Sequence, residues 1–159
     1  MDVNLRATRR FRAPPAAVFA LALDPVRFPA TFRGYGPIPA IRSIALHAPP
    51  AVGATRELDN SDGSRPRERI TALERDRRHA YVLSNLAAPF SWLVRAGHAD
   101  WTFGAEGEGT AVEWRYRFEL TSPLAWPLAA PLLHAFFAPA MRRCLAAMAV
   151  TLESAPEPA

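Results

Sequence analysis

Lysine is absent from this chain, so all 19 of its basic residues are arginine. The formal net charge of +4 comes with an alanine-, arginine- and proline-rich composition that is typical of GC-rich coding. The densest arginine runs, 65–69 and 74–78, contain interleaved acids and no aromatic residue. This pattern argues against a stacking platform for single-stranded nucleic acid, and no nucleic-acid partner is predicted.

A single cysteine, Cys144, excludes an internal disulfide and a metal site built from several cysteines. Its position on an apolar helix face favours a packed hydrophobic residue over a reactive thiol. No glycine-rich phosphate loop follows a predicted strand, no Gly-x-Ser-x-Gly elbow occurs, and no histidine pair has zinc-ligand spacing. The sequence therefore predicts neither a metal nor a cofactor.

The first twelve residues carry four arginines and no apolar signal core, so no secretion signal is visible. The expected location is cytoplasmic. Residues 123–141 lack formal charge, but their four prolines would leave backbone groups that lipid cannot satisfy. We predict a buried, proline-kinked helix and no transmembrane segment, with peripheral membrane contact as an alternative; the oligomeric state stays open.

A long C-terminal helix, Ser122 to Leu152, is the strongest pattern in the chain. Ser122-Pro123 is a typical helix start, because the hydroxyl can cap free N–H groups and proline needs none. Pro139 is expected to bend or restart the helix near Phe137. One face is apolar at spacings of three and four, with Leu133, Phe137, Met141, Cys144 or Leu145, Met148 and Leu152.

Alternation with a period of two predicts an antiparallel sheet of about seven strands that packs against this helix. The first strand spans about Val3 to Phe11, and two short helices follow, starting at Pro14-Pro15 and at Asp24-Pro25, the second limited by Pro29. Six further strands are expected at 38–46, 52–60, 67–74, 81–86, 92–103 and 111–120. The fold class is α+β, with one domain at 1–153 and a frayed tail at 154–159.

The last strand has the clearest faces. Its apolar face carries Val112, Trp114, Tyr116, Phe118 and Leu120, and its other face alternates glutamate with arginine. The apolar face is predicted to meet the helix. In the preceding strand the same alternation turns Arg95 inward, unless Gly97 marks a bulge that shifts the register.

Several motifs together suggest a family. They are the opening Phe11-Arg-Ala-Pro-Pro-Ala-Ala-Val-Phe19, the stretch Asp24-Pro-Val-Arg-Phe-Pro29, the strand entry Val52-Gly-Ala-Thr55, and Gly109-Thr-Ala-Val-Glu-Trp114. With the order β-α-α-β₆-α, the chain resembles the START-like, or SRPBCC, superfamily, in particular its polyketide cyclase/dehydrase-like branch, from about Val3 to Leu152. The resemblance implies a helix-grip fold, a curved sheet around the last helix with a cavity between them. Family members bind lipids, sterols, polyketides, plant hormones or quinones, and some are aromatase/cyclases or hydrolases, without a shared catalytic motif.

Candidate ligand-binding residues lie where sheet and helix should face each other or at the mouth between them: Tyr35, Glu68, Tyr81, Arg95, Trp101, Trp114, Tyr116, Phe118, His134, Phe137 and Met141. The aromatic ones either fill this space as core or leave a hollow.

Glu68 and Arg95 are the catalytic candidates. Glu68 shares a strand face with Ile70 and Ala72, and alternation turns Arg95 inward from another strand. If both point inward they need each other or a ligand, and otherwise they are surface residues. His98 and Asp100 share the outer face, which favours a solvated pair over acid/base or metal chemistry.

Three functions stay open. The first is binding of a small, largely apolar molecule in the cavity. The second is a polyketide cyclase/dehydrase-like enzyme that uses Glu68, with Arg95 steadying a developing enolate. The third is a partner-binding or membrane-surface module that uses the proline-rich first half of the last helix.

Overall fold

Strict alternation makes β7 (Gly109–Leu120) a half-buried strand. In the computed structural model, which describes residues 1–154, the predicted apolar face of β7 is buried and the glutamate-arginine face points outward. The prediction for this strand is confirmed. The aromatic row of β7 faces the C-terminal helix, where Tyr116 and Phe118 pack against Phe137.

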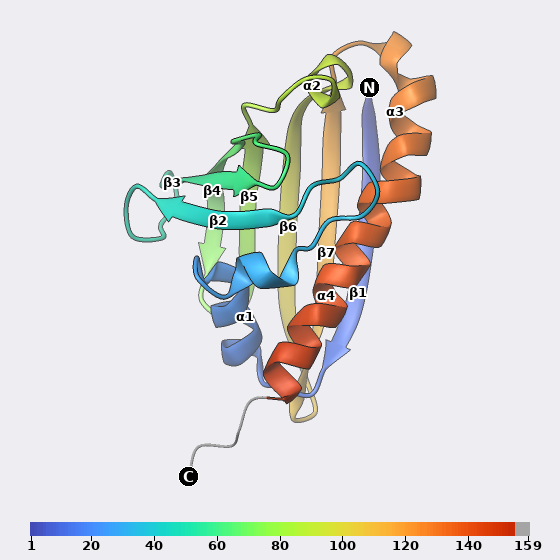
Figure 1. Ribbon diagram of the computed structural model, residues 1–159. Coiled ribbons are helices and arrows are strands. Elements are labelled where there is room, and N and C mark those ends of the chain that lie inside the picture. Colours follow the sequence, from blue (N-terminus) through green and yellow to red (C-terminus); the bar gives the residue numbers. More distant parts are fainter. Residues whose placement is uncertain (155–159) are drawn as a thin grey trace.

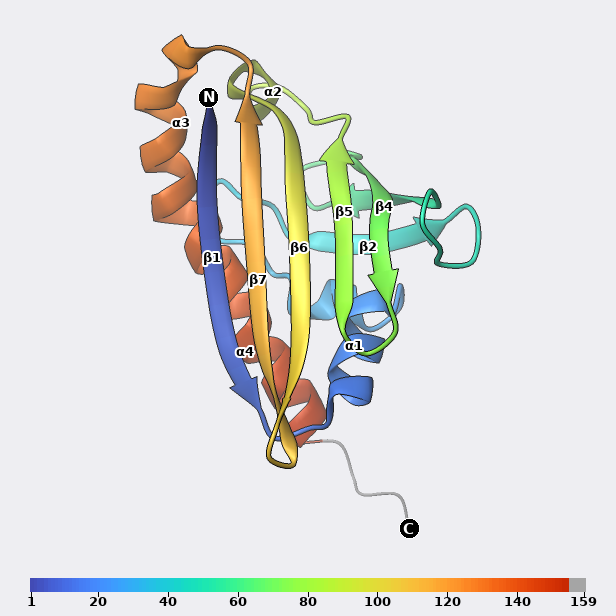
Figure 2. The ribbon, with the colours of Figure 1, turned by 180° about the vertical axis from the view of Figure 1, so that it is seen from behind.

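The sheet has seven antiparallel strands in the order β1-β7-β6-β5-β4-β3-β2, so the first and last strands of the chain are neighbours. Figures 1 and 2 show it as one curved layer with the helices on a single face. The predicted helix-grip architecture is confirmed. The other strands are β1 (Asp2–Phe11), β2 (Ile41–Leu46), β3 (Thr55–Asn60), β4 (Arg67–Glu74), β5 (Arg78–Ser84) and β6 (Val94–Glu106).

Two strands are shorter than predicted. β2 begins at Ile41 because the preceding loop still contains Pro39, and β3 begins at Thr55 because Gly53 turns with a φ of 90°. β5 is shifted rather than shortened: it begins at Arg78, before the predicted start at residue 81, and ends at Ser84 because Asn85 has a φ of 58° and leaves the strand conformation.

The predicted pair of short helices is present as α1 (Pro15–Leu23) and a 3₁₀ helix, η1 (Phe28–Thr31). The second one begins later than predicted. Asp24 Oδ1 accepts from the N–H groups of Val26 and Arg27 (2.9 and 3.0 Å) and so holds a turn before η1. Pro29 lies inside η1 rather than limiting it, since a first-turn proline needs no N–H.

The C-terminal helix runs as a 3₁₀ turn η2 (Pro123–Ala125), α3 (Trp126–Leu132), a π turn η3 (Leu133–Phe137) and α4 (Ala138–Glu153). Ser122 Oγ accepts from the Leu124 N–H (3.1 Å), so the predicted cap forms. Pro139 lies in the first turn of α4, directly after the π turn, which agrees with the irregularity predicted near Phe137. Within residues 1–154, Pro123–Glu153 is the one helix long and apolar enough to span a membrane.

This helix is nevertheless the core helix, because the inner face of α4 packs fully buried on the sheet. An unpredicted one-turn helix, α2 (Phe90–Leu93), precedes β6. The predicted tail lies, apart from Ser154, outside the described residues.

An aromatic ladder fills most of the space between sheet and helix. The rings of Trp101 and Trp114 stack with centroids 4.1 Å apart, and those of Tyr116 and Phe118 stack at 4.6 Å. Phe137 from the helix meets Tyr116 and Phe118 edge-on at 5.0 and 4.8 Å. Each such pair contributes about 0.5–1.5 kcal/mol beyond its buried area, so these rings form a packed core.

Candidate functional site

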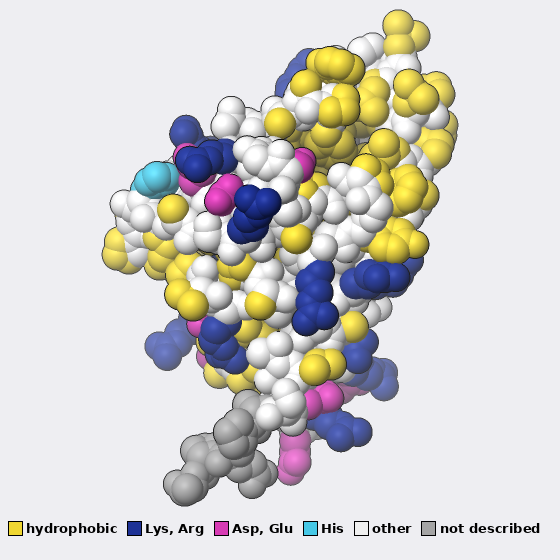
Figure 3. All heavy atoms as spheres, in the orientation of Figure 1, with side chains coloured by type: hydrophobic (Ala, Val, Ile, Leu, Met, Phe, Trp, Pro, Cys, Tyr) yellow, Lys and Arg dark blue, Asp and Glu magenta, His cyan; other side chains and the backbone are white. Residues whose placement is uncertain are grey.

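A cavity of about 410 Å³ remains where β3, β4 and β5 curve away from the C-terminal helix. Its walls are mostly apolar, and its mouth lies between the loops 37–41, 60–66 and 86–90 and the end of α3. Figure 3 shows a hollow surrounded by apolar side chains below α2. The space between the sheet and the helix therefore holds both a packed core and an open cavity.

Of the residues predicted to bind a ligand, some line the cavity and others are packed in the adjoining core. Glu68, Tyr81, Trp114, Tyr116 and Phe137 line the cavity. The remaining buried members, Trp101, Phe118 and Met141, lie in the packed core and are not among the lining residues.

Tyr35 and His134 lie outside the cavity. The ring of Tyr35 packs 6.1 Å from that of Phe136, and the Arg143 guanidinium lies 4.5 Å above it. His134 is on the exposed side of the π turn. Neither residue is among those that line the hollow.

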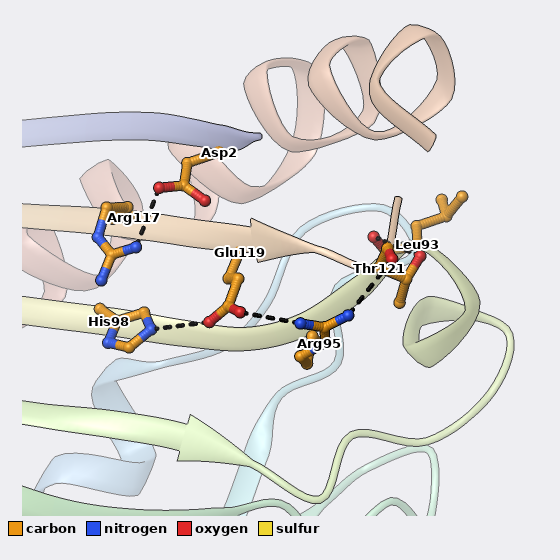
Figure 4. A network of polar contacts seen from close by, with 7 residues as sticks. All are labelled: Asp2, Leu93, Arg95, His98, Arg117, Glu119 and Thr121. Atoms are coloured by element: carbon orange, nitrogen blue, oxygen red, sulfur yellow. Dashed lines mark hydrogen bonds and ion pairs between the residues drawn. The ribbon is translucent and has the colours of Figure 1, made fainter. Parts of the chain in front are cut away.

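The inward orientation predicted for Arg95 is wrong. A register shift between Val94 and Ala96, opposite Leu120 and Glu119, turns the Arg95 side chain to the outer face. There its Nη1 lies 3.2 Å from Glu119 Oε1. Figure 4 shows this pair on the outer face of the sheet. The bulge considered as the alternative does occur, a little before Gly97. Arg95 therefore cannot pair with Glu68 or steady a group in the cavity.

The outer face of β6 also holds the His98 and Asp100 pair, in agreement with the prediction of solvated contacts. His98 Nε2 lies 3.4 Å from Glu119 Oε2 (Figure 4), and Asp100 accepts from the Arg78 guanidinium at 2.8 and 3.0 Å. Within residues 1–154 no group of three or more His, Cys, Asp or Glu side chains could hold a metal ion.

Glu68 does face inward, and its partner is Arg56. The two residues are opposite each other in β4 and β3, and Arg56 Nε donates to Glu68 Oε2 at 2.6 Å. Both are nearly inaccessible to water, at 5% and 3% exposed. Arg56 Nη2 also lies 3.0 Å from His79 Nε2, and its guanidinium is 5.5 Å from the centre of the Tyr81 ring. Of this buried group Glu68 lines the cavity, whereas Arg56 and His79 are not among the lining residues.

Sequence reasoning missed Arg56 and His79. β3 reads Thr-Arg-Glu-Leu-Asp-Asn, which is polar on both faces, so alternation does not say which face is buried. The available signal was the register of the β3–β4 hairpin, which places a cation directly opposite Glu68.

Burial determines the protonation states of Glu68, His79 and the nearby tyrosines. It raises the pKa of the Glu68 carboxyl, because the loss of water outweighs the attraction of Arg56. Burial and the Arg56 charge lower the pKa of His79 to about 3, so the imidazole is neutral at pH 7. Burial also raises the pKa of Tyr81 and of Tyr116, so both remain phenols. The polar side of the cavity thus offers a carboxyl and two phenols within apolar walls.

Comparison with known families agrees with this architecture. The family model described as polyketide cyclase / dehydrase and lipid transport matches residues 2–153. The chain therefore belongs to this family, and the resemblance inferred from its motifs is confirmed. No curated protein sequence matches the chain.

Solved structures share the fold at low sequence identity. The di-domain ARO/CYC protein StfQ from the steffimycin biosynthetic pathway has a TM-score of 0.74 at 14% identity, over 96% of this chain and 52% of that one. Norcoclaurine synthase from Thalictrum flavum, in complex with dopamine and hydroxybenzaldehyde, has a TM-score of 0.71 at 10% identity, over 99% and 90% of the two chains. A protein from Thermus thermophilus has a TM-score of 0.70 at 21% identity, over 96% and 99%. The family and these neighbours indicate a polyketide cyclase-like, ligand-binding fold.

Proposed function

We propose that the protein binds a small, largely apolar molecule in the cavity between the sheet and the C-terminal helix. The observation that carries the proposal is the cavity itself, about 410 Å³ beside an otherwise densely packed aromatic core. Protein interiors rarely leave voids much larger than a water molecule, because an unfilled void destabilises the fold. The volume falls in the range of about 300–1,000 Å³ that ligand pockets occupy.

The charges in the wall favour a ligand without net charge. Arg56 is already paired with Glu68 at 2.6 Å and contacts His79 with another nitrogen. An anion entering the cavity would have to compete with Glu68, and a cation would have to displace Arg56, each with its own loss of hydration. A neutral molecule avoids both costs.

The test is displacement of the neutral dye N-phenyl-1-naphthylamine, together with native mass spectrometry after gentle purification. Leu83→Trp fills the cavity from β5, whereas Val82→Trp places the same ring on the opposite face of the same strand. We expect the wild type and Val82→Trp to bind the dye and Leu83→Trp to lose at least about tenfold in affinity. Equal binding by all three proteins, or no bound molecule and no dye binding in the wild type, would reject the proposal.

A cyclase- or dehydrase-like activity is a second candidate, favoured by the Glu68 carboxyl in the cavity wall. A carboxyl whose pKa is raised by burial is a suitable general acid or base. Arg56, and not Arg95, is the arginine that pairs with this carboxyl, but it does not line the cavity. In this case Glu68→Gln should abolish turnover of a short synthetic β-polyketone, while the variant, although less stable, stays folded and still binds the dye. Unchanged turnover by the variant would exclude Glu68.

We also propose that the cavity end of the molecule contacts a lipid membrane surface. Large apolar side chains of α2 and of the segment from η2 to α3 are exposed there, with Trp92 at 72% and Leu124 at 89%, joined by Trp126 and Leu128. Figure 3 shows apolar side chains gathered over this end. Exposed tryptophans and leucines without a carboxylate on either helix suit a membrane interface.

Flotation with vesicles of mixed neutral and anionic phospholipid tests this contact. Trp126→Ser/Leu128→Ser should leave the protein unbound. The matched control, Val26→Ser/Val150→Ser, removes exposed apolar side chains elsewhere and should float like the wild type. A wild type that never floats, or a dimer in solution that hides these residues, would reject membrane contact.

A further inference from the structure

The cavity wall holds an unpaired hydrogen-bond acceptor at the end of β3. Asn60 lines the cavity and is 8% exposed, and its Oδ1 has no partner among the described residues. Buried side-chain oxygens nearly always have a partner, which is protein, water or ligand. This atom is therefore a candidate contact for whatever occupies the cavity.

The neighbouring loop determines which amide atom of Asn60 is unpaired. The Ser64 hydroxyl donates its single proton to Asp62 Oδ1 at 2.5 Å, and the Ser64 N–H donates to the same oxygen at 2.9 Å. Ser64 Oγ can then only accept, and it accepts from Asn60 Nδ2 at 3.1 Å. The amide nitrogen must face Ser64, so the carbonyl oxygen is the atom left without a partner.

This corner of the cavity offers acceptors rather than donors. Asp62, whose side chain is a further acceptor, also lines it. Arg56 is four residues back along β3, about 13 Å away at the rise of a strand, and is already paired. Arg42 donates to the Ser61 carbonyl oxygen at 2.9 Å and is not among the lining residues.

We propose that this corner selects an apolar ligand that carries a hydroxyl group, whose proton Asn60 Oδ1 accepts. The inference rests on the proposed binding function and adds the chemical class of the ligand. A carboxylate at the same end of a ligand has no proton to donate and would be repelled by Asp62. An ether or a hydrocarbon would leave Asn60 Oδ1 unpaired, which makes binding weaker than its apolar area suggests.

The experiment uses three probes of nearly equal size, 2-naphthol, 2-methylnaphthalene and 2-naphthoate, competing with N-phenyl-1-naphthylamine. For the wild type we expect 2-naphthoate to bind more weakly than 2-naphthol. Asn60→Leu should weaken 2-naphthol about fivefold or more and leave 2-methylnaphthalene within about twofold. Asn60→Gln keeps both an amide N–H and a carbonyl oxygen near this position and should bind 2-naphthol more tightly than Asn60→Leu does.

The outcomes separate this inference from the binding function. If Asn60→Leu weakens 2-naphthol and 2-methylnaphthalene equally, Asn60 only shapes the loop and the inference is wrong. If neither the dye nor any of the three probes binds the wild type, the proposed binding function is wrong and the inference is wrong with it. If Asn60→Leu does not unfold cooperatively on heating, the variant is not folded and the relative affinities of the probes for the wild type decide. In that case 2-naphthoate binding as tightly as 2-naphthol overturns the inference.

Discussion

Replacing Arg56 alone should destabilise the protein more than replacing both members of its ion pair. Arg56→Leu leaves the Glu68 carboxyl buried without the guanidinium that now lies 2.6 Å away. Breaking a buried pair in this way typically costs about 3–5 kcal/mol. We expect a loss in this range for Arg56→Leu and a comparable one for Glu68→Leu.

The double variant, Arg56→Leu/Glu68→Leu, should recover most of the loss, because it leaves no unpaired charge behind. Its remaining cost is about 1–3 kcal/mol, since His79 Nε2 loses the donor that lies 3.0 Å from it. The two single effects therefore sum to several kcal/mol more than the double effect, and this difference measures the coupling within the pair.

Urea unfolding followed by tryptophan fluorescence measures these free energies. The effect of pH gives a second readout. In Arg56→Leu the folded-state pKa of Glu68 rises further, so its stabilising contribution is present below about pH 4.5 and is lost as pH rises through the folded pKa. The variant should therefore be closer to the wild type at pH 5 than at pH 8. A single-variant loss below about 1 kcal/mol, or a double effect equal to the sum of the singles, would refute the reasoning.

Three further outcomes follow from buried groups. The pKa of His79 is about 3 in the folded protein and about 6.5 in the unfolded one, so the free energy of unfolding should fall by about 2 kcal/mol from pH 6.5 to 5. The fall should be smaller in His79→Asn. An equal change in both proteins, measured by urea unfolding at the two pH values, would contradict this. Gly97→Ala should cost about 1–3 kcal/mol in thermal unfolding, because its Cβ would lie 2.7 Å from Tyr116 Cε1, whereas Gly104→Ala on the same strand meets nothing closer than 3.8 Å and should be mild. Equal effects would contradict that account. Burial raises the pKa of Cys144 to about 12, so iodoacetamide should modify it only in urea, and labelling of the native protein, seen by mass spectrometry, would disprove this.

The fold could be predicted from the sequence wherever one face of an element is clearly apolar. β7 and α4 have such faces, and their mutual packing determines the architecture. β3 carries polar residues on both faces, so Arg56 could not be assigned to the interior from alternation. The register shift that turns Arg95 outward is a single extra residue, which alternation alone does not locate.

The candidate site was less predictable, because the size of a cavity depends on how closely the sheet, the helix and the loops approach one another. Its aromatic wall, including Trp114 and Phe137, could be expected from strand and helix faces. Its rim comes from the loops 37–41, 60–66 and 86–90, which are far apart in the sequence and meet only in the folded chain. The unpaired oxygen of Asn60 depends on hydrogen bonds within one of those loops, which no period in the sequence reveals.

The pairing of β1 with β7 has a consequence for how the chain is made. Asp2 lies opposite Glu119, so β1 leaves the ribosome more than a hundred residues before the strand with which it pairs. At about 5–20 residues per second, that interval is on the order of ten seconds, during which β1 is an unpaired edge able to associate with other chains. The exposed arginines Arg6, Arg9 and Arg10 give the unpaired β1 a positive charge, which opposes such association. The sheet can close only after nearly the whole chain has been synthesised.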